Sequence, residues 1–222
     1  LRLLCPAIHM LRGGEVCERC KGGRFWQAVA GRCVKDSRPA SALAALETAH
    51  QWRRKIYPRT VSLFLCPSAF YARKYREWGY PPEKVRHLPN FVDTRRWDPA
   101  ALPAAERRDG YLYFGRLSRE KGLATLLAAQ ARWEAEAAAG GPPPLRLEIA
   151  GTGPAEPQLR HRAAELGLTS VRFLGGLAPA QLREALARAR FSVLPSEWYE
   201  NGPMAGLESL AAGVPLVGTA IG

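Results

Sequence analysis

Residues 195–208 read PSEWYENGPMAGLE, and the fold around the predicted site follows from this stretch. The apolar run FSVL at 191–194 precedes it and has the length of one buried strand. Pro203 suits the first position of a helix, because that position needs no backbone donor. The residues that follow, 204–212, predict a helix that Gly213 ends. The stretch therefore predicts a strand, a loop and a helix in succession.

Two carboxylates flank the start of this helix, with Glu200 in the loop and Glu208 in the second helical turn. The first N–H groups of a helix have no partner within it, so those of Met204 and Ala205 favour an anion. A phosphate on these amides, with sugar hydroxyls donating to the carboxylates, would satisfy both kinds of group. The arrangement predicts a site for a nucleotide-sugar.

From Gly110 onward, short apolar strands alternate with helices. We expect strands at 111–114, 145–150, 171–174, 191–194 and 215–217, and helices at 123–139, 155–166, 179–189 and 204–212. Strict alternation is typical of an α/β fold in which a parallel sheet is covered on both faces. Such sheets bind ligands beyond the carboxyl ends of their strands.

The first part of the chain has a less regular pattern. It predicts a helix over 41–56 with an apolar stripe that includes Leu43 and Leu46, then a strand at 61–66. A helix from Ser68 to Gly79 and a strand at 85–88 follow. Three aromatic residues have helical spacing in that last helix and are expected in the core: Tyr71, Tyr75 and Trp78.

The loop that leaves the strand at 111–114 carries two cations. In GRLSREKG at 115–122, Gly115 permits a tight turn and is followed by Arg116 and Lys121. A diphosphate leaving group needs such cations, because negative charge builds up on it as the glycosidic bond breaks. No cofactor is therefore expected for catalysis.

Gly151 and Gly153 leave the next strand. A full dinucleotide fingerprint would need a third glycine, but none follows and Pro154 interrupts the pattern. This disfavours a dehydrogenase.

Taken together, these motifs resemble family 4 glycosyltransferases, which are retaining enzymes of the GT-B fold. ENGP, four further residues, Glu208 and then SLAAGVP at 209–215 resemble the donor-site signature of that family. GRL-x3-KG resembles its phosphate clamp, and PNFVD at 89–93 resembles its passage into the donor domain. The resemblance implies a Rossmann-like donor domain at 91–222 and part of an N-terminal acceptor-side α/β domain at 1–90. We also expect missing material at both ends, and the resemblance implies a catalytic histidine within a few residues upstream of Leu1.

The resemblance further implies a role for each residue. Glu208 binds the donor ribose and Glu200 binds the sugar hydroxyls. The backbone groups of Leu174 and Gly175 contact the nucleotide base. The expected catalytic residues are Arg116, Lys121 and Glu200. The expected donor-binding residues are Gly115, Gly151, Gly153, Leu174, Gly175, Asn201, Gly202, Met204, Ala205 and Glu208.

The N-terminal segment holds four cysteines: Cys5, Cys17, Cys20 and Cys33. Cys17 and Cys20 form a C-x2-C knuckle, which lets two thiolates meet one tetrahedral ion, and the other two would complete a structural zinc site. Four thiolates leave no open coordination position, so a zinc ion here would not be catalytic. Because the sequence shows no export signal, disulfides are disfavoured. The alternative is four reduced, partly buried thiols.

Charge is distributed unevenly along the chain, whose net charge is +12. Residues 1–109 contain 21 Lys and Arg against 10 Asp and Glu, and residues 110–222 contain 11 against 10. The basic half suits an anionic membrane surface or an acidic acceptor, or else it is a solvated arginine-rich surface. We expect a cytoplasmic protein with peripheral contact at the inner face of the plasma membrane.

The sequence thus predicts a glycosyltransferase that acts on a nucleotide-diphosphate sugar and on a sugar or lipid-linked acceptor in surface polysaccharide or glycolipid synthesis. Two alternatives stay open. A zinc-containing nucleic-acid-binding protein would explain the basic half and the cysteines but not the acid pair, so no nucleic acid is expected. A GT-B sugar-nucleotide epimerase would share the donor site and need no acceptor.

Overall fold

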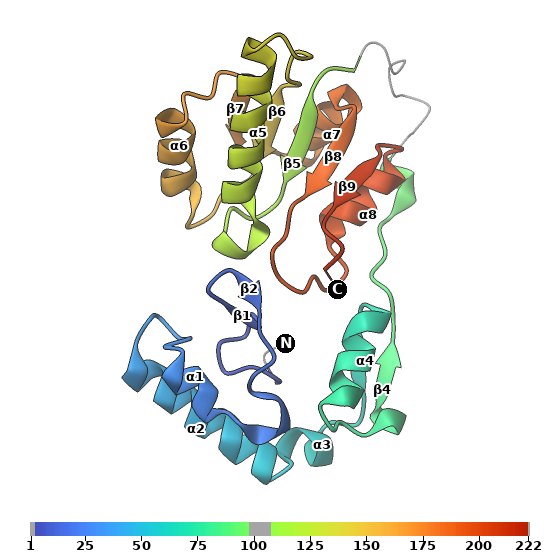
Figure 1. Ribbon diagram of the computed structural model, residues 1–222. Helices are drawn as coiled ribbons and strands as arrows, with labels where there is room; N and C mark the ends of the chain where they lie inside the picture. Colours follow the sequence, from blue (N-terminus) through green and yellow to red (C-terminus); the bar gives the residue numbers. More distant parts are fainter. Residues whose placement is uncertain (1–2, 98–107, 222) are drawn as a thin grey trace. The chain divides into compact units, whose positions relative to one another are not determined.

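The computed structural model describes residues 3–97 and 108–221, and these fall into two compact units (Figure 1). Unit 1 comprises Leu1–Asn90 with Glu197–Gly202 and Ile221–Gly222, and unit 2 comprises Phe91–Ser196 with Pro203–Ala220. The sequence assigned all of 91–222 to one domain, whereas the structure places Glu197–Gly202 with unit 1. The crossing predicted at 89–109 includes 98–107, which lie outside the described residues.

Unit 2 contains the parallel sheet that the alternating pattern predicted, with strand order β7-β6-β5-β8-β9. Its strands are β5 (Tyr111–Phe114), β6 (Leu147–Ala150), β7 (Val171–Gly175), β8 (Phe191–Leu194) and β9 (Leu216–Gly218). All four neighbouring pairs are parallel, with Tyr111 opposite both Leu147 and Phe191. The carboxyl ends of the strands therefore meet at one edge (Figure 1).

Helices cover both faces of this sheet. They are α5 (Leu123–Ala138), α6 (Glu156–Glu165), α7 (Pro179–Arg188) and α8 (Met204–Ala211). Unit 2 also contains the 3-10 turns η3 (Thr94–Arg96) and η6 (Arg119–Lys121). Tyr111 and Tyr113 of β5 pack with α5 and α6, while Leu112 and Phe114 pack with α7 and the end of α8. Successive strand residues point to opposite faces, so the almost continuously apolar β5 is buried on both sides. This confirms the predicted α/β fold.

Unit 1 combines helices with two small sheets. Its helices are α1 (Trp26–Ala30), α2 (Arg38–Arg53), α3 (Ile56–Thr60) and α4 (Ala69–Glu77), with the 3-10 turns η1 (Lys21–Gly23) and η2 (Pro82–Lys84). β1 (Leu11–Arg12) and β2 (Glu15–Val16) form an antiparallel hairpin, and β3 (Phe64–Cys66) pairs with β4 (Val85–His87) in parallel. Tyr71 and Trp78 are buried and Tyr75 packs against the same core, as predicted.

Part of the stripe predicted for the first long helix is wrong, although Ala49, which the stripe also included, packs against the core. Leu43 and Leu46 are 72% and 69% exposed, and Ser41 and Ala45 are buried instead. Both sets of residues repeat with the helical period, but small residues allow a neighbouring helix to approach more closely. α2 also ends earlier than expected, at Arg53, because Pro58 has no N–H to continue the ladder. Lys55 is left-handed (φ 50°) at the break.

No helix of the described residues is both long and apolar enough to cross a membrane.

Candidate donor-binding site

The loops that leave β5, β6 and β7 are joined by backbone hydrogen bonds at the carboxyl edge of the sheet. The N–H of Gly151 donates to the carbonyl oxygen of Gly175 at 2.7 Å, and that of Gly115 donates to Ala150 at 3.0 Å. Leu117 donates to Thr152 at 2.9 Å, and Ala155 donates back to Leu117 at 3.0 Å. The predicted donor-site glycines of these three strands therefore share one surface.

Glycine is required at two of these positions by close backbone approach. A Cβ on Gly151 would lie 1.9 Å from the carbonyl oxygen of Gly115, and one on Gly153 would lie 2.2 Å from that of Leu117. Gly151 also has a φ of 131°, which other residues rarely adopt. The absence of side chains here allows the loops after β5 and β6 to pack directly against each other.

The two predicted phosphate-binding cations lie on the loop after β5. The hydroxyl of Tyr113 donates to the Arg116 carbonyl oxygen at 2.8 Å, which fixes the backbone where the loop leaves the strand. The Arg116 side chain is exposed, and within the described ranges its guanidinium forms no ion pair. Lys121 ends η6, and Gly122 follows in the left-handed conformation with a φ of 68°. Arg116 can therefore bind an anion without breaking an internal pair.

Helix α8 carries the second carboxylate and is held against β8 by buried hydroxyls. Ser192 and Ser209 share a hydrogen bond of 2.6 Å, and Ser209 also donates to the Val214 carbonyl oxygen at 3.1 Å. Gly206 allows the helix to pack on Leu194 and Leu216, since a Cβ there would lie 3.3 and 3.2 Å from their methyl groups. Met204 and Ala205 form the first helical turn, as predicted.

Glu208 lies in the second turn of α8 and is partly buried. Burial raises the pKa of its carboxyl group, because the charged form is less well solvated there. Among the described residues, no group donates a hydrogen bond to this carboxylate. A partly buried carboxylate without a protein partner is suited to accept hydrogen bonds from a ligand.

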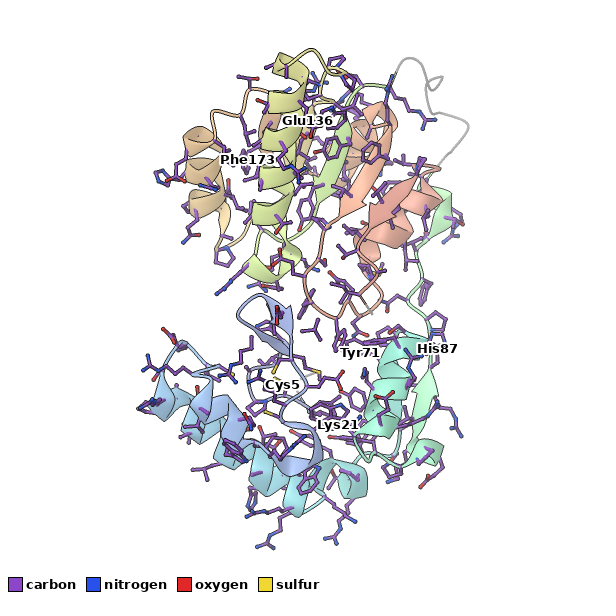
Figure 2. The ribbon with its side chains drawn as sticks, viewed as in Figure 1. Cys5, Lys21, Tyr71, His87, Glu136 and Phe173 are labelled. Carbon is purple, nitrogen blue, oxygen red and sulfur yellow. The ribbon has the colours of Figure 1, made fainter. Side chains whose placement is uncertain are left out.

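Glu200, Asn201 and Gly202 belong to unit 1, whose side chains hold the segment that carries them. Asn90 Nδ2 donates to the Gly202 carbonyl oxygen at 2.7 Å, and the Tyr71 hydroxyl donates to that of Tyr199 at 3.2 Å (Figure 2 labels Tyr71 on α4). Among the expected site residues, Glu200 therefore belongs to unit 1, whereas the glycine loops, both cations and Glu208 belong to unit 2.

Tyr199, next to Glu200, is anchored by its ring and its hydroxyl. The ring centroid lies 4.6 Å from that of Phe70, and the hydroxyl donates to Glu18 Oε1 at 2.7 Å. Lys74 Nζ also lies 2.7 Å from that oxygen. Burial alone would raise the pKa of Glu18, but the bonds from Lys74 and Tyr199 outweigh it and lower the pKa.

These anchoring residues were not predicted. Glu18 and Tyr199 are 181 positions apart in the sequence, and neither belongs to a periodic pattern. Asn90 was noted only as part of the PNFVD motif, which gave no sign that its side chain reaches Gly202. Long-range bonds between a side chain and the backbone leave no local signal in the sequence.

Several known proteins resemble this chain in sequence or in fold. The family model described as glycosyl transferases group 1 matches residues 95–222. Glycogen synthase of Mycobacterium tuberculosis is 33% identical over 166 residues, which are 72% of this chain and 38% of that protein. A putative colanic acid biosynthesis glycosyltransferase, WcaL of Salmonella typhimurium, is 29% identical over 167 residues, or 72% of this chain and 40% of that protein. The chain thus spans about two fifths of the length of these relatives.

A solved structure supports the fold. The Anabaena protein HepE, in complex with UDP and glucose, superposes with a TM-score of 0.64 at 19% identity, over 82% of this chain and 55% of that one. The comparisons give no support to the nucleic-acid-binding or epimerase alternatives. The sheet has the GT-B architecture, and the family model covers more than half of the sequence. The chain therefore belongs to the glycosyl transferases group 1 family.

Proposed function

We propose that the protein is a retaining glycosyltransferase of family 4 that transfers a sugar from a nucleotide-diphosphate donor to an acceptor hydroxyl. The observation that supports the proposal is the meeting of the glycine loops after β5, β6 and β7 at the carboxyl edge of the sheet, with Arg116 on the first of these loops and, within the described residues, in no ion pair. Glu208 adds a partly buried carboxylate that, among the same residues, accepts no hydrogen bond. Arg116 and Lys121 would hold the diphosphate with the first amides of α8, and Glu208 would accept hydrogen bonds from the ribose. Glu200 would receive the sugar hydroxyls.

In this mechanism the bond between the anomeric carbon and the diphosphate oxygen breaks while the acceptor oxygen attacks the same face of the sugar. Charge on the leaving diphosphate grows, so the cations bind the transition state more strongly than the bound donor. The leaving phosphate accepts the proton of the acceptor hydroxyl. Arg116, Lys121 and the α8 amides carry the charge stabilisation.

The test is thermal stabilisation of the full-length protein by UDP-, GDP- and ADP-sugars, followed by a transfer assay. One nucleotide class should raise the unfolding temperature, because a ligand that binds only the folded state stabilises it by mass action. UDP-sugars come first, because HepE was solved with UDP. NMR of the product should show the same anomeric configuration as the donor. Stabilisation by none of the three classes, or inversion at the anomeric carbon, would contradict the proposal.

The basic half supports a lipid-linked acceptor at an anionic membrane surface. Arg53, Arg54, Lys55 and Arg59 are exposed around the end of α2 and in α3. We expect the protein to sediment with vesicles that contain phosphatidylserine but not with neutral ones, and to dissociate as salt rises. Equal sedimentation with both kinds of vesicle would exclude this electrostatic attachment.

Donor affinity should depend on the protonation of Glu208. The raised pKa means that this carboxyl is still protonated at a pH where an ordinary glutamate is ionised. Donor affinity should therefore fall as the pH is lowered through that raised pKa, since the protonated form accepts hydrogen bonds poorly. Replacing Glu208 by Gln should weaken donor binding by roughly 10–100-fold at neutral pH, the usual range for bonds to a charged group. Calorimetry over a pH series should show that the donor affinity of E208Q does not change with pH in this range. If the donor affinity of E208Q depends on pH as that of the unmutated protein does, Glu208 does not belong to the site.

A further inference from the structure

The four cysteines of the N-terminal segment meet around one small cavity in unit 1. The cavity has a volume of about 20 Å³, and Cys5, Cys17, Cys20 and Cys33 all line it together with Met10 and Trp78. Figure 2 labels Cys5 in this part of unit 1. A volume of that size accommodates roughly one water-sized particle. Three separate stretches of sequence thus place four cysteines around a space of about the size of one ion.

The four cysteines lie close enough together for each of their six pairs to interact electrostatically. Four thiolates side by side are unfavourable alone, but a divalent cation between them reverses the sign of the interaction.

The backbone that follows Cys5 forms a tight, strained turn. The N–H of Ile8 donates to the Cys5 carbonyl oxygen at 2.9 Å, which closes a tight turn directly after this cysteine. Ile8 and Met10 have φ values of 72° and 50°, which are strained for residues with side chains. Such strain persists only where the surroundings require that conformation.

Two residues near the cavity are also suited to neighbouring thiolates. A Cβ on Gly31 would lie 2.9 Å from the Cys33 sulfur, so a residue without a side chain gives that sulfur room. The Trp78 indole N–H is buried and has no hydrogen-bond partner in the described part of the chain. A buried donor without a partner is costly, and a thiolate would be an acceptor for it.

We propose that Cys5, Cys17, Cys20 and Cys33 bind one structural zinc ion. The four thiols lose their protons to solvent, and four Zn–S bonds form in a closed tetrahedral site without an open position for substrate. Within residues 3–97 and 108–221, no three Cys, His, Asp or Glu side chains already stand in a metal-binding arrangement. Zinc binding therefore requires the cysteine side chains to rotate toward the cavity, and it would fix the backbone of the knuckle between Cys17 and Cys20.

The knuckle connects this ion to the loop that carries Glu200. Glu18 lies between Cys17 and Cys20, and it accepts the hydrogen bond from Tyr199 at 2.7 Å. Fixing the knuckle fixes Glu18, which in turn orients Tyr199 beside Glu200. Tyr199 is thus a positioning residue, and this second step rests on the proposed function, whereas the metal site does not.

The metal site is tested on full-length protein produced in zinc-supplemented medium without added chelator. Elemental analysis should find about one zinc per chain, and the C17S/C20S variant should lose it. The matched control is Cys66→Ala, which removes a buried cysteine of β3 that does not line the cavity, and it should retain zinc.

A spectroscopic measurement avoids any folding defect of the variants. Replacing zinc by Co²⁺ in the unmutated protein should give the thiolate-to-cobalt charge-transfer and visible bands of a tetrahedral sulfur site. Folded protein without metal, a disulfide among the four cysteines, or a metal that C17S/C20S retains would each overturn the proposal.

The connection to the loop is tested separately with Tyr199→Phe, which keeps the ring on Phe70 and removes only the hydroxyl. This variant should keep its zinc and its donor KM but lose about tenfold in kcat, as expected when a catalytic group is slightly misplaced. Wild-type kcat with zinc bound would refute the connection alone. Failure of every nucleotide-sugar to bind would refute the proposed function and leave the zinc measurement unaffected.

Discussion

Replacing Lys121 by Ala should lower kcat by about 10²–10³-fold, the usual cost of removing one preorganised group that stabilises developing charge. The donor diphosphate gains negative charge as it leaves, so the ammonium group contributes more to the transition state than to the bound donor. The Kd for the nucleotide-sugar should change much less than kcat. Single-turnover kinetics combined with calorimetric titration would separate the two effects.

The matched control is Arg119→Ala, which removes an exposed cation from the same short turn, η6. If the local positive charge alone were responsible, both variants would slow transfer similarly. We expect Arg119→Ala to be near wild type, and Lys121→Arg to be partly active because it keeps the charge but changes its geometry. Wild-type turnover in Lys121→Ala would refute the assignment.

The fold of unit 2 could be predicted because its apolar runs, its turn residues and its helical periodicity all indicate the same structure. β5 is apolar at every position, is followed by Gly115 and lies before a periodic helix, so strand, turn and helix are each specified locally. Parallel strands then place their carboxyl ends together, which brings Gly115, Gly151 and Gly175 to one edge without further information. The meeting of these glycines at one edge of the sheet followed from the sequence for this reason.

Unit 1 was less predictable because its contacts are not local. Two sets of residues in α2 repeat with the helical period, and they lie on different faces of the helix. Only the packing of neighbouring elements decides that Ser41 and Ala45 are buried and that Leu43 and Leu46 are exposed. The segment Glu197–Gly202 gave no sign of its attachment, because Tyr71 and Asn90 bind its carbonyl groups. Tyr199, a side chain that anchors it, meets residues more than a hundred positions away. Hydrophobic periodicity predicts elements, but it does not predict which distant loop an element will hold.

Replacing Gly151 by Ala should destabilise unit 2 by at least about 3 kcal/mol, an effect in the range of overpacked and strained positions. The new Cβ would lie 1.9 Å from the Gly115 carbonyl oxygen, and that atom is backbone that cannot rotate away. The φ of 131° adds strain, because alanine does not adopt it readily. Relief would require the loops after β5 and β6 to separate, which would break the bonds from Gly115 to Ala150 and from Leu117 to Thr152.

Gly167→Ala is the matched control for this change. Gly167 also has a positive φ, 65°, but no atom lies within 4 Å of the Cβ that alanine would add. It should therefore cost only the left-handed strain, about 1 kcal/mol. Thermal unfolding followed by circular dichroism should show a decrease of roughly 10 °C for Gly151→Ala, with a smaller decrease for the control. Since the same loops form the proposed diphosphate surface, Gly151→Ala should also lose donor binding at temperatures where it is still folded, whereas Gly167→Ala should keep it. Equal unfolding temperatures for the two variants would show that the loops do not approach as closely as described.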